Sequence, residues 1–251
     1  MAVVIGYFAE ELRTGRVLEQ NADETFPAAS VLKVALALEA HASLDLGERI
    51  PLRDEDKVIG SGVLSALASG LAPTLGDLVY LACAISDNTA ANLVLAHAGV
   101  DRVNARLASL GLTTTRVRGK IFTPEQGELS PVTPREAARL LALVARREAG
   151  PPAACDAVMA LLARTQTAST IGRGLPDARF DEDPPVRLAH KTGSITGVVH
   201  DVGIVRTADV EYVVALMSKG SDDRRPNHDN VMRVKLGEIS RSIYEAFTRT
   251  R

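Results

Sequence analysis

The chain has 251 residues, of which 46% are hydrophobic and 24% charged, and its formal net charge is −2. These values are typical of a soluble globular protein that buries a sizeable core. No block of Lys and Arg stands out, and no stretch approaches the ~18 apolar residues of a membrane span. We therefore expect neither nucleic acid nor a membrane as a partner.

The first residues predict two strands, Val3–Leu12 and Arg16–Gln20, joined by a tight turn at "RTG". A long helical region follows. Apolar residues recur there at helical spacing in Ser30–His41, Leu75–Ile85, Thr89–Ala98, Asp101–Leu110 and Ala154–Arg164.

Another helix is predicted to begin at "TPREAARLLALVARR". Thr133 is placed as its N-cap, Pro134 occupies the first helical position, and Glu136 follows three residues after the cap. This order is that of a capping box, in which the glutamate reaches back to the backbone of the cap residue.

The final third of the chain changes to β-branched segments. "VRLAHKTGSI", "GVVHDVGIVRT" and "EYVVALMSKG" predict three strands, and a closing helix is expected at about Asn230–Thr248. Strands at both ends with helices between them predict an α/β fold of the α+β type, whose antiparallel sheet contains both chain ends. We expect a single domain over 1–251, with an α/β part at about 1–28 and 167–251 and an all-helical part at about 29–166.

The cysteines and histidines do not indicate a catalytic or metal site. Cys83 and Cys155 lie in apolar helical contexts without metal-ligand spacing, which favours two buried free thiols. His190, His200 and Asp201 lie on predicted strands, where successive side chains point to opposite faces. A metal shared by these residues is therefore not expected.

The stretch "AASVLKVALAL" places Ser30 and Lys33 three residues apart at a predicted helix start. Such residues share one helix face, so the lysine can act as the base that a serine nucleophile needs. Backbone N–H groups of a first helical turn also stabilise developing negative charge. The spacing alone favours a helix cap and a solvated lysine, because about one S-x-x-K is expected by chance in a chain this long.

Two further motifs favour the catalytic interpretation. Ser86-Asp87-Asn88 falls between two predicted helices, and Lys191-Thr192-Gly193 lies on a predicted strand, followed by Ser194. The set S-x-x-K, S-D-N and K-T-G in this order is the signature of class A β-lactamases and penicillin-binding proteins. The chain resembles that superfamily over nearly its whole length, including "ISDNTAANLVL" and "IGRGLP" before "AHKTGSITG".

The resemblance implies a role for each motif residue. Ser30 would be the acylated nucleophile and Lys33 its proton acceptor. Ser86 would relay a proton to the leaving nitrogen, with Lys191 beside Ser86 keeping the site positive. Asn88 would hydrogen-bond to an amide of the substrate, and Thr192 and Ser194 would bind a carboxylate of the substrate. The N–H groups of Ser30 and Ser194 would form the oxyanion hole. Because two nearby lysines lower each other's pKa, one of them can serve as a base near neutral pH.

One part of the family pattern is missing. Class A β-lactamases carry a glutamate in a loop after the helical core, and it activates the water that removes the acyl group. In the corresponding "TRVRGKIFTPEQGELSPVTPRE", Lys120 or Ile121 occupies that position, and Ser130 replaces the aspartate at the loop neck. Glu125 and Glu128 remain as candidate substitutes, although both also fit as solvated loop carboxylates.

The resemblance therefore implies a serine hydrolase that forms a covalent acyl-enzyme, without a metal or cofactor. Opening of a β-lactam ring with slow deacylation is the leading expectation. A DD-peptidase or esterase with the same acylation residues, or a β-lactam-binding sensor that stays acylated, are the alternatives. We expect a monomer with a small-molecule substrate. No signal peptide is predicted, so a full-length chain would be cytoplasmic and a trimmed one periplasmic or secreted.

Overall fold

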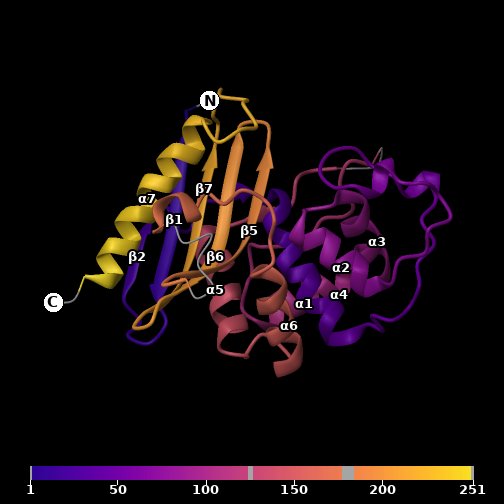
Figure 1. Cartoon of the computed structure of the whole chain (residues 1–251), viewed down its shortest axis with the longest axis horizontal. Coiled ribbons are helices and arrows are strands. Elements are labelled where there is room, and N and C mark those ends of the chain that lie inside the picture. Colours follow the sequence, from indigo (N-terminus) through magenta and orange to yellow (C-terminus); the bar gives the residue numbers. More distant parts are fainter. Residues whose placement is uncertain (1, 124–126, 177–183, 250–251) are drawn as a thin grey trace.

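The computed structural model describes residues 2–123, 127–176 and 184–249. Its main sheet has five antiparallel strands in the order β2-β1-β7-β6-β5. The strands are β1 (Val4–Glu11), β2 (Val17–Gln20), β5 (Arg187–Ile195), β6 (Val198–Arg206) and β7 (Glu211–Lys219). The first and last strands pair side by side, as Figure 1 shows, which confirms the predicted sheet from both chain ends.

Both faces of this sheet are covered. Along β7, Tyr212 and Val214 face the C-terminal helix α7 (Val231–Thr248), whereas Val213 and Ala215 face the helical side of the molecule. This period of two is that of a strand buried on both faces. Helix α7 crosses one side of the sheet (Figure 1), and α5 (Pro134–Ala145) packs against β1, β6 and β7 on the other.

The remaining helices are α1 (Lys33–Ser43), α2 (Leu75–Ala84), α3 (Asn88–Ala98), α4 (Val100–Ser109) and α6 (Pro152–Leu162). Of these, α6 lies beside α5 at the lower centre of Figure 1, and the others lie to its right. Short 3₁₀ turns are η1 (Ala29–Leu32), η2 (Asp54–Asp56), η3 (Leu64–Ala66) and η4 (Gly172–Gly174). The predicted helices are all present, but α1 begins at Lys33 and Ser30 lies in the 3₁₀ turn before it.

A second, two-stranded sheet was not predicted. β3 (Phe26–Pro27) pairs with β4 (Pro131–Val132), and the Ala28 N–H donates to the Ser130 carbonyl at 2.7 Å. Strands of two residues carry no periodicity that a sequence pattern can reveal. This small sheet joins the segment before Ser30 to the end of the loop at residues 118–130.

The predicted capping box at α5 is half right. The Thr133 hydroxyl accepts the Glu136 N–H at 3.1 Å, as a cap should. The Glu136 carboxylate, however, accepts the N–H groups of Thr113, Thr114 and Thr115 at 2.9, 3.0 and 2.6 Å. Burial raises the pKa of Glu136, but these donors hold it below its ordinary value. Glu136 therefore anchors the turn that leads into the 118–130 loop.

Cys83 and Cys155 are both buried and free. The His200 ring joins β6 to β3: its Nε2 lies 2.7 Å from the Pro27 carbonyl, and burial lowers its pKa to about 4. The ring is therefore neutral at pH 7. Within the described residues, no group of His, Cys, Asp and Glu could hold a metal ion. None of the helices in the same part of the chain is long and apolar enough to span a membrane.

Candidate active site

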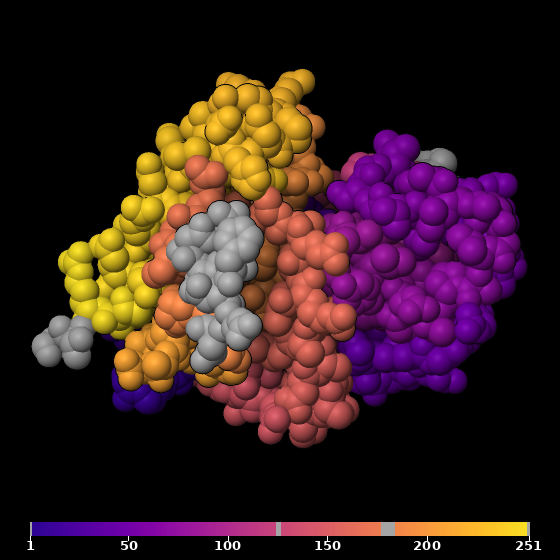
Figure 2. Space-filling view, viewed as in Figure 1, coloured from indigo at the N-terminus to yellow at the C-terminus, as the bar shows by residue number. Residues whose placement is uncertain are grey.

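Ser30 lies where two cavities meet, between the sheet and the helical region. The smaller cavity has a volume of about 260 Å³, and its lining includes Ser30, Ser61, Ser86, Thr192, Ser194 and Arg233. The larger cavity has a volume of about 1350 Å³, and its lining includes Ser30, Asn88, Lys120, Ile121, Leu129 and Ser194. The lining combines residues of the helical region, such as Ser86, with residues of the C-terminal part, such as Arg233, and Figure 2 shows these two parts of the chain in purple and in orange to yellow.

The backbone around Ser30 is held from two directions. Ala29, just before it, has a positive φ of 46°, a conformation that non-glycine residues rarely adopt. Strand β5 approaches from the other side at Gly193, where an added Cβ would come within 3.1 Å of the Ser30 backbone nitrogen. Only glycine allows this close approach without a shift, and it brings the backbone of Ser30 next to β5.

The turn between α2 and α3 presents Ser86 and Asn88. Ser86 has a φ of 61°, which orients its hydroxyl into the smaller cavity. Asp87 instead caps α3 by accepting the Ala90 N–H at 2.9 Å, and its second oxygen accepts the Val63 N–H at 2.7 Å. Asp87 therefore holds the neighbouring loop in place while Ser86 and Asn88 line the two cavities.

Two buried lysines converge on the Ser86 hydroxyl. The Lys191 ammonium donates to Ser86 Oγ at 3.0 Å, and that of Lys33 at 3.3 Å. Lys33 also donates to the Ser86 carbonyl at 2.7 Å and to Asn88 Oδ1 at 2.9 Å. Lys191 is completely buried, and Lys33 is 5% exposed. The predicted residues of all three motifs thus lie together, although Lys33 bonds to Ser86 and Asn88 and no hydrogen bond to Ser30 is found within the described residues.

Burial changes the protonation of both lysines. Desolvation, reinforced by the charge of Lys191, lowers the pKa of Lys33 to about 7. Desolvation also lowers the pKa of Lys191 to about 8, while Asp201 acts in the opposite direction. At neutral pH a large fraction of Lys33 is therefore unprotonated and Lys191 is mostly charged, which gives the site one base and one cation.

Strand β5 is supported from behind and along its edge. The Thr192 and Thr167 hydroxyls lie 2.8 Å apart at the smaller cavity. His190 Nδ1 lies 2.9 Å from Asp201 Oδ1, and the other Asp201 oxygen accepts the Thr170 N–H at 2.7 Å. The His190–Asp201 pair was not predicted, because it joins residues diagonally opposed on β5 and β6. It ties β5 to the 165–171 segment that lines the cavity.

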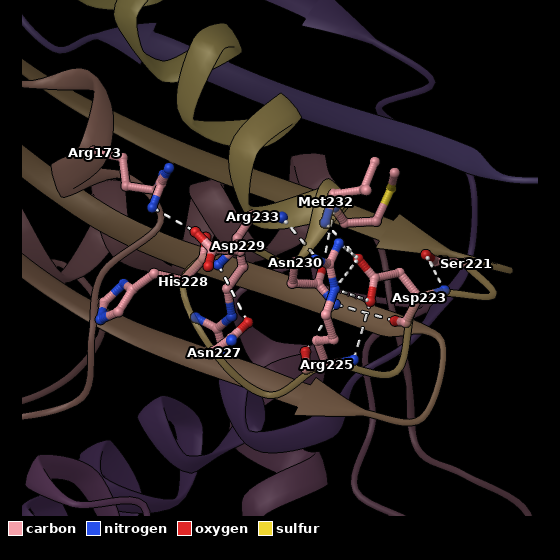
Figure 3. A network of polar contacts seen from close by, with 11 residues as sticks. Arg173, Ser221, Asp223, Arg225, Asn227, His228, Asp229, Asn230, Met232 and Arg233 are labelled. Carbon is pink, nitrogen blue, oxygen red and sulfur yellow. Dashed lines mark hydrogen bonds and ion pairs between the residues drawn. The ribbon is translucent and has the colours of Figure 1, made fainter.

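The β7–α7 loop, residues 220–230, contributes Pro226, Asn227 and His228 to the lining of the smaller cavity, and a network of polar contacts holds it (Figure 3). Asp223 accepts the N–H of Val231 at 2.8 Å and the guanidinium of Arg225 at 2.7 Å. Arg173 donates to the His228 carbonyl at 3.1 Å. These contacts fix the loop beside Arg233, whose side chain is a cation at the cavity wall.

The described residues of the 118–130 loop, 118–123 and 127–130, line the larger cavity, and asparagines on two helices hold the chain at and just before the start of this loop. The Asn92 side chain bonds to both the N–H and the carbonyl of Ile121, at 2.9 and 2.8 Å. Asn104 bonds in the same way to Val117, at 2.8 Å in each direction. At the neck, Ser130 Oγ accepts the Arg118 N–H at 3.1 Å.

The candidate deacylation bases are placed unequally. Glu128 lines the larger cavity, but its carboxylate pairs with Arg118 and its side chain is 82% exposed. Glu125 lies outside the described residues. Lys120 and Ile121, one of which is predicted to occupy the position of the family's glutamate, both line the larger cavity with Ser30.

Sequence reasoning missed several residues at the site. Ser61, Thr167 and Arg233 line the smaller cavity, and Asn92 positions the loop. None of them belongs to a recognisable short motif. Only the position of Asn92 could have indicated a role, because it lies in the predicted helix that follows the Ser86 motif, six residues after Ser86.

The model of the Beta-lactamase enzyme family matches residues 2–247. A solved structure of a β-lactamase from Sphaerobacter thermophilus DSM 20745 is 33% identical, with a TM-score of 0.86 over 98% of this chain and 92% of that chain. The chain therefore belongs to the β-lactamase enzyme family and is a class A β-lactamase-like serine hydrolase.

Two other solved structures show the same fold at lower identity. A point mutant of PBP-A, solved as an acyl-enzyme complex with penicillin G, is 24% identical, with a TM-score of 0.84 over 98% of this chain and 91% of that chain. A class A β-lactamase from Mycobacterium abscessus is 21% identical, with a TM-score of 0.83 over 97% of this chain and 93% of that one. The class A fold is thus found both in the β-lactamase from Mycobacterium abscessus and in PBP-A.

Proposed function

We propose that the protein opens β-lactam rings through an acyl-enzyme on Ser30 and releases the product slowly. The observation that carries this proposal is the Ser86 hydroxyl, held between two buried lysines beside Ser30. A hydroxyl in this position can pass a proton to a leaving nitrogen, which allows the carbon–nitrogen bond to break.

Acylation requires two proton transfers. Ser30 Oγ attacks the lactam carbonyl and loses its proton to the neutral amine of Lys33, three residues on. The carbon–nitrogen bond then breaks, and the nitrogen takes a proton from the Ser86 hydroxyl. A proton from the neighbouring lysines then restores this hydroxyl. The low pKa of Lys33 supports this role, because a base with a pKa near 7 is effective at neutral pH.

Backbone and side-chain donors would bind the substrate around this centre. The N–H groups of Ser30 and Ser194 would form the oxyanion hole, which the close approach of Gly193 supports. Thr192 and Ser194 would receive a substrate carboxylate in the smaller cavity, where Arg233 adds a positive charge. Asn88, whose amide is held by Lys33, would bind the acyl amide at the larger cavity.

Deacylation would be slow because the loop offers no free carboxylate beside Ser30 within the described residues. Ile121 is fixed at the wall of the larger cavity, and Glu128 is already paired with Arg118. A DD-peptidase or esterase would use the same acylation residues on another acyl donor, and a sensor would remain acylated. The missing carboxylate favours these two alternatives over a fast β-lactamase.

Intact-mass spectrometry over time after mixing with benzylpenicillin tests the proposal. An adduct that forms quickly and decays slowly is expected, and Ser30→Ala should abolish it while leaving the fold intact by circular dichroism. An adduct that never decays would assign the protein to the binding class, and no adduct would exclude β-lactams as substrates. An adduct of normal yield in Ser30→Ala would refute Ser30 as the nucleophile.

A further inference from the structure

The two halves of an acyl donor bound at Ser30 would occupy different cavities. Ser86 lines only the smaller cavity, so the leaving nitrogen and everything attached to it must lie there. The acyl side chain, on the other side of the carbonyl, must then extend into the larger cavity. That cavity has about five times the volume of the other, about 1350 against 260 Å³. It offers space for an acyl group much longer than the ring being opened.

Part of the lining of the larger cavity is apolar. Ile121, Phe122, Leu129 and Ile195 all contribute to it. Phe122 and Leu129 are 42% and 47% exposed. A chain of methylene groups that contacts these side chains would remove apolar surface from water on both sides of the contact.

Among the described residues that line this cavity, one charged side chain has no counter-charge. The charged side chains in its described lining are Arg118, Lys120 and Glu128. Arg118 and Glu128 pair with each other. Lys120 is exposed and has no hydrogen-bond or ion-pair partner within the described residues. A cation in the same cavity as these apolar side chains is complementary to a carboxylate at the end of an aliphatic chain.

We propose that the larger cavity is a subsite for acyl donors whose side chain is aliphatic and ends in a carboxylate, with Lys120 as its counter-ion. This inference rests on the proposed acylation of Ser30 and narrows the substrate class of the same site. Lys120 would act on binding and orientation of the acyl half, and it would take no part in the chemistry at Ser30.

Matched penicillins test the subsite. Each pair carries a malonyl, succinyl or adipoyl side chain on the same nucleus, once as the free carboxylate and once as the neutral primary amide. The second-order rate constant for acylation of Ser30 is measured for each compound by intact mass. At low salt we expect the carboxylate to react about 5-fold faster than its amide at one or more chain lengths, the upper range for an ion pair with an exposed partner.

Variants assign the preference to its residue. Lys120→Gln should bring the carboxylate-to-amide ratio to about 1, and Lys120→Arg should retain it. Lys235→Gln, which removes an exposed lysine of α7, is the matched control and should leave the ratio as in the parent. The ratio of the parent should also shrink as salt rises from about 20 to about 500 mM, because screening weakens an exposed ion pair.

The outcomes separate this inference from the proposed function. If no penicillin acylates Ser30, the proposed function itself fails. If all of them acylate Ser30 but the ratio is about 1 at every chain length in the parent, the carboxylate subsite is refuted and the acylation proposal stands. A preference that persists unchanged in Lys120→Gln would place the counter-ion elsewhere and would refute the role of Lys120.

Discussion

Replacing Ile121 with glutamate should convert slow turnover into fast turnover. The Ile121 backbone is fixed by Asn92 at both its N–H and its carbonyl, and its side chain lines the cavity that contains Ser30. A carboxylate introduced there would lie at the acyl-enzyme with its backbone already positioned. Ile121 is half-buried, so the variant should fold, at a cost of about 1 kcal/mol of lost apolar burial.

The expected gain follows from general-base catalysis. A positioned base typically accelerates proton transfer from water by about 10²–10⁴-fold, which corresponds to about 3–5 kcal/mol of barrier. The acylation step should change little, because its proton transfers use Lys33, Ser86 and Lys191, which the substitution leaves in place. Deacylation should therefore rise alone until it no longer limits turnover.

Pre-steady-state hydrolysis of a chromogenic cephalosporin measures both steps. The parent should release a burst of one equivalent of product before a slow steady state. Ile121→Glu should show the same initial rate with no burst, or a smaller one, and a steady state at least about 10²-fold faster. Ile121→Gln, which matches the size without the base, is the control and should keep the burst of the parent.

Two results would refute this reasoning. If Ile121→Glu folds, acylates at the parent rate and still turns over slowly, the position is not one from which water is activated. If the parent shows fast linear turnover without a burst, the loop already holds a working base. Glu125→Gln and Glu128→Gln then identify it, and if neither slows turnover, Lys33 acting in both steps becomes the explanation.

Three further predictions concern protonation and the loop supports. The acylation rate constant should rise with pH as Lys33 loses its proton near pH 7 and fall as Lys191 loses its charge near pH 8; a flat profile from about pH 6 to 9 would contradict these roles. Asn92→Ala removes both side-chain bonds to Ile121 and should lower the free energy of unfolding in urea by about 1–3 kcal/mol, whereas an unchanged value would show that the clamp is unimportant. Because the folded pKa of Glu136 is lowered, its stabilisation is present above its unfolded value and is lost as pH falls through the folded value. Glu136→Gln should therefore destabilise the protein at pH 7 and less so below about pH 4.5, and an equal loss at both pH values would argue against the charge.

The residues at the centre of the site were predictable because each belongs to a motif whose spacing carries chemistry. Ser30, Ser86 and Lys191 were named from short patterns, and the structure brings Ser86 and Lys191 into direct contact and places Ser30 on the wall of the same cavity. The sheet was equally predictable, since β-branched runs at both ends of the chain have no other partners. Whether these motif residues perform the assigned chemistry remains a prediction for the experiments above.

Contacts between distant polar groups were not predictable. Glu136 has the spacing of a capping-box residue, but three N–H groups in the turn at 113–115 offered its carboxylate more hydrogen bonds than one cap could. His190 and Asp201 were judged separately from strand alternation, which does not give the register between β5 and β6. In both cases the partner is fixed by tertiary packing, about which local spacing contains no information.

The hydrogen bonds from Asn92 and Asn104 indicate a role for the 118–130 loop other than supplying a base. Asn92 and Asn104 each bond to a backbone N–H and a carbonyl, so the backbone is fixed at Val117 and Ile121 even though Ile121 offers no base. A wall held this firmly still shapes the larger cavity and places Lys120 beside it. If the wall selects the acyl half, substrates differ mainly in how fast they acylate Ser30, and deacylation is uniformly slow. A set of penicillins should then vary widely in acylation rate while their adducts decay at similar rates, and adducts whose decay rates vary as widely as their formation would contradict this division of roles.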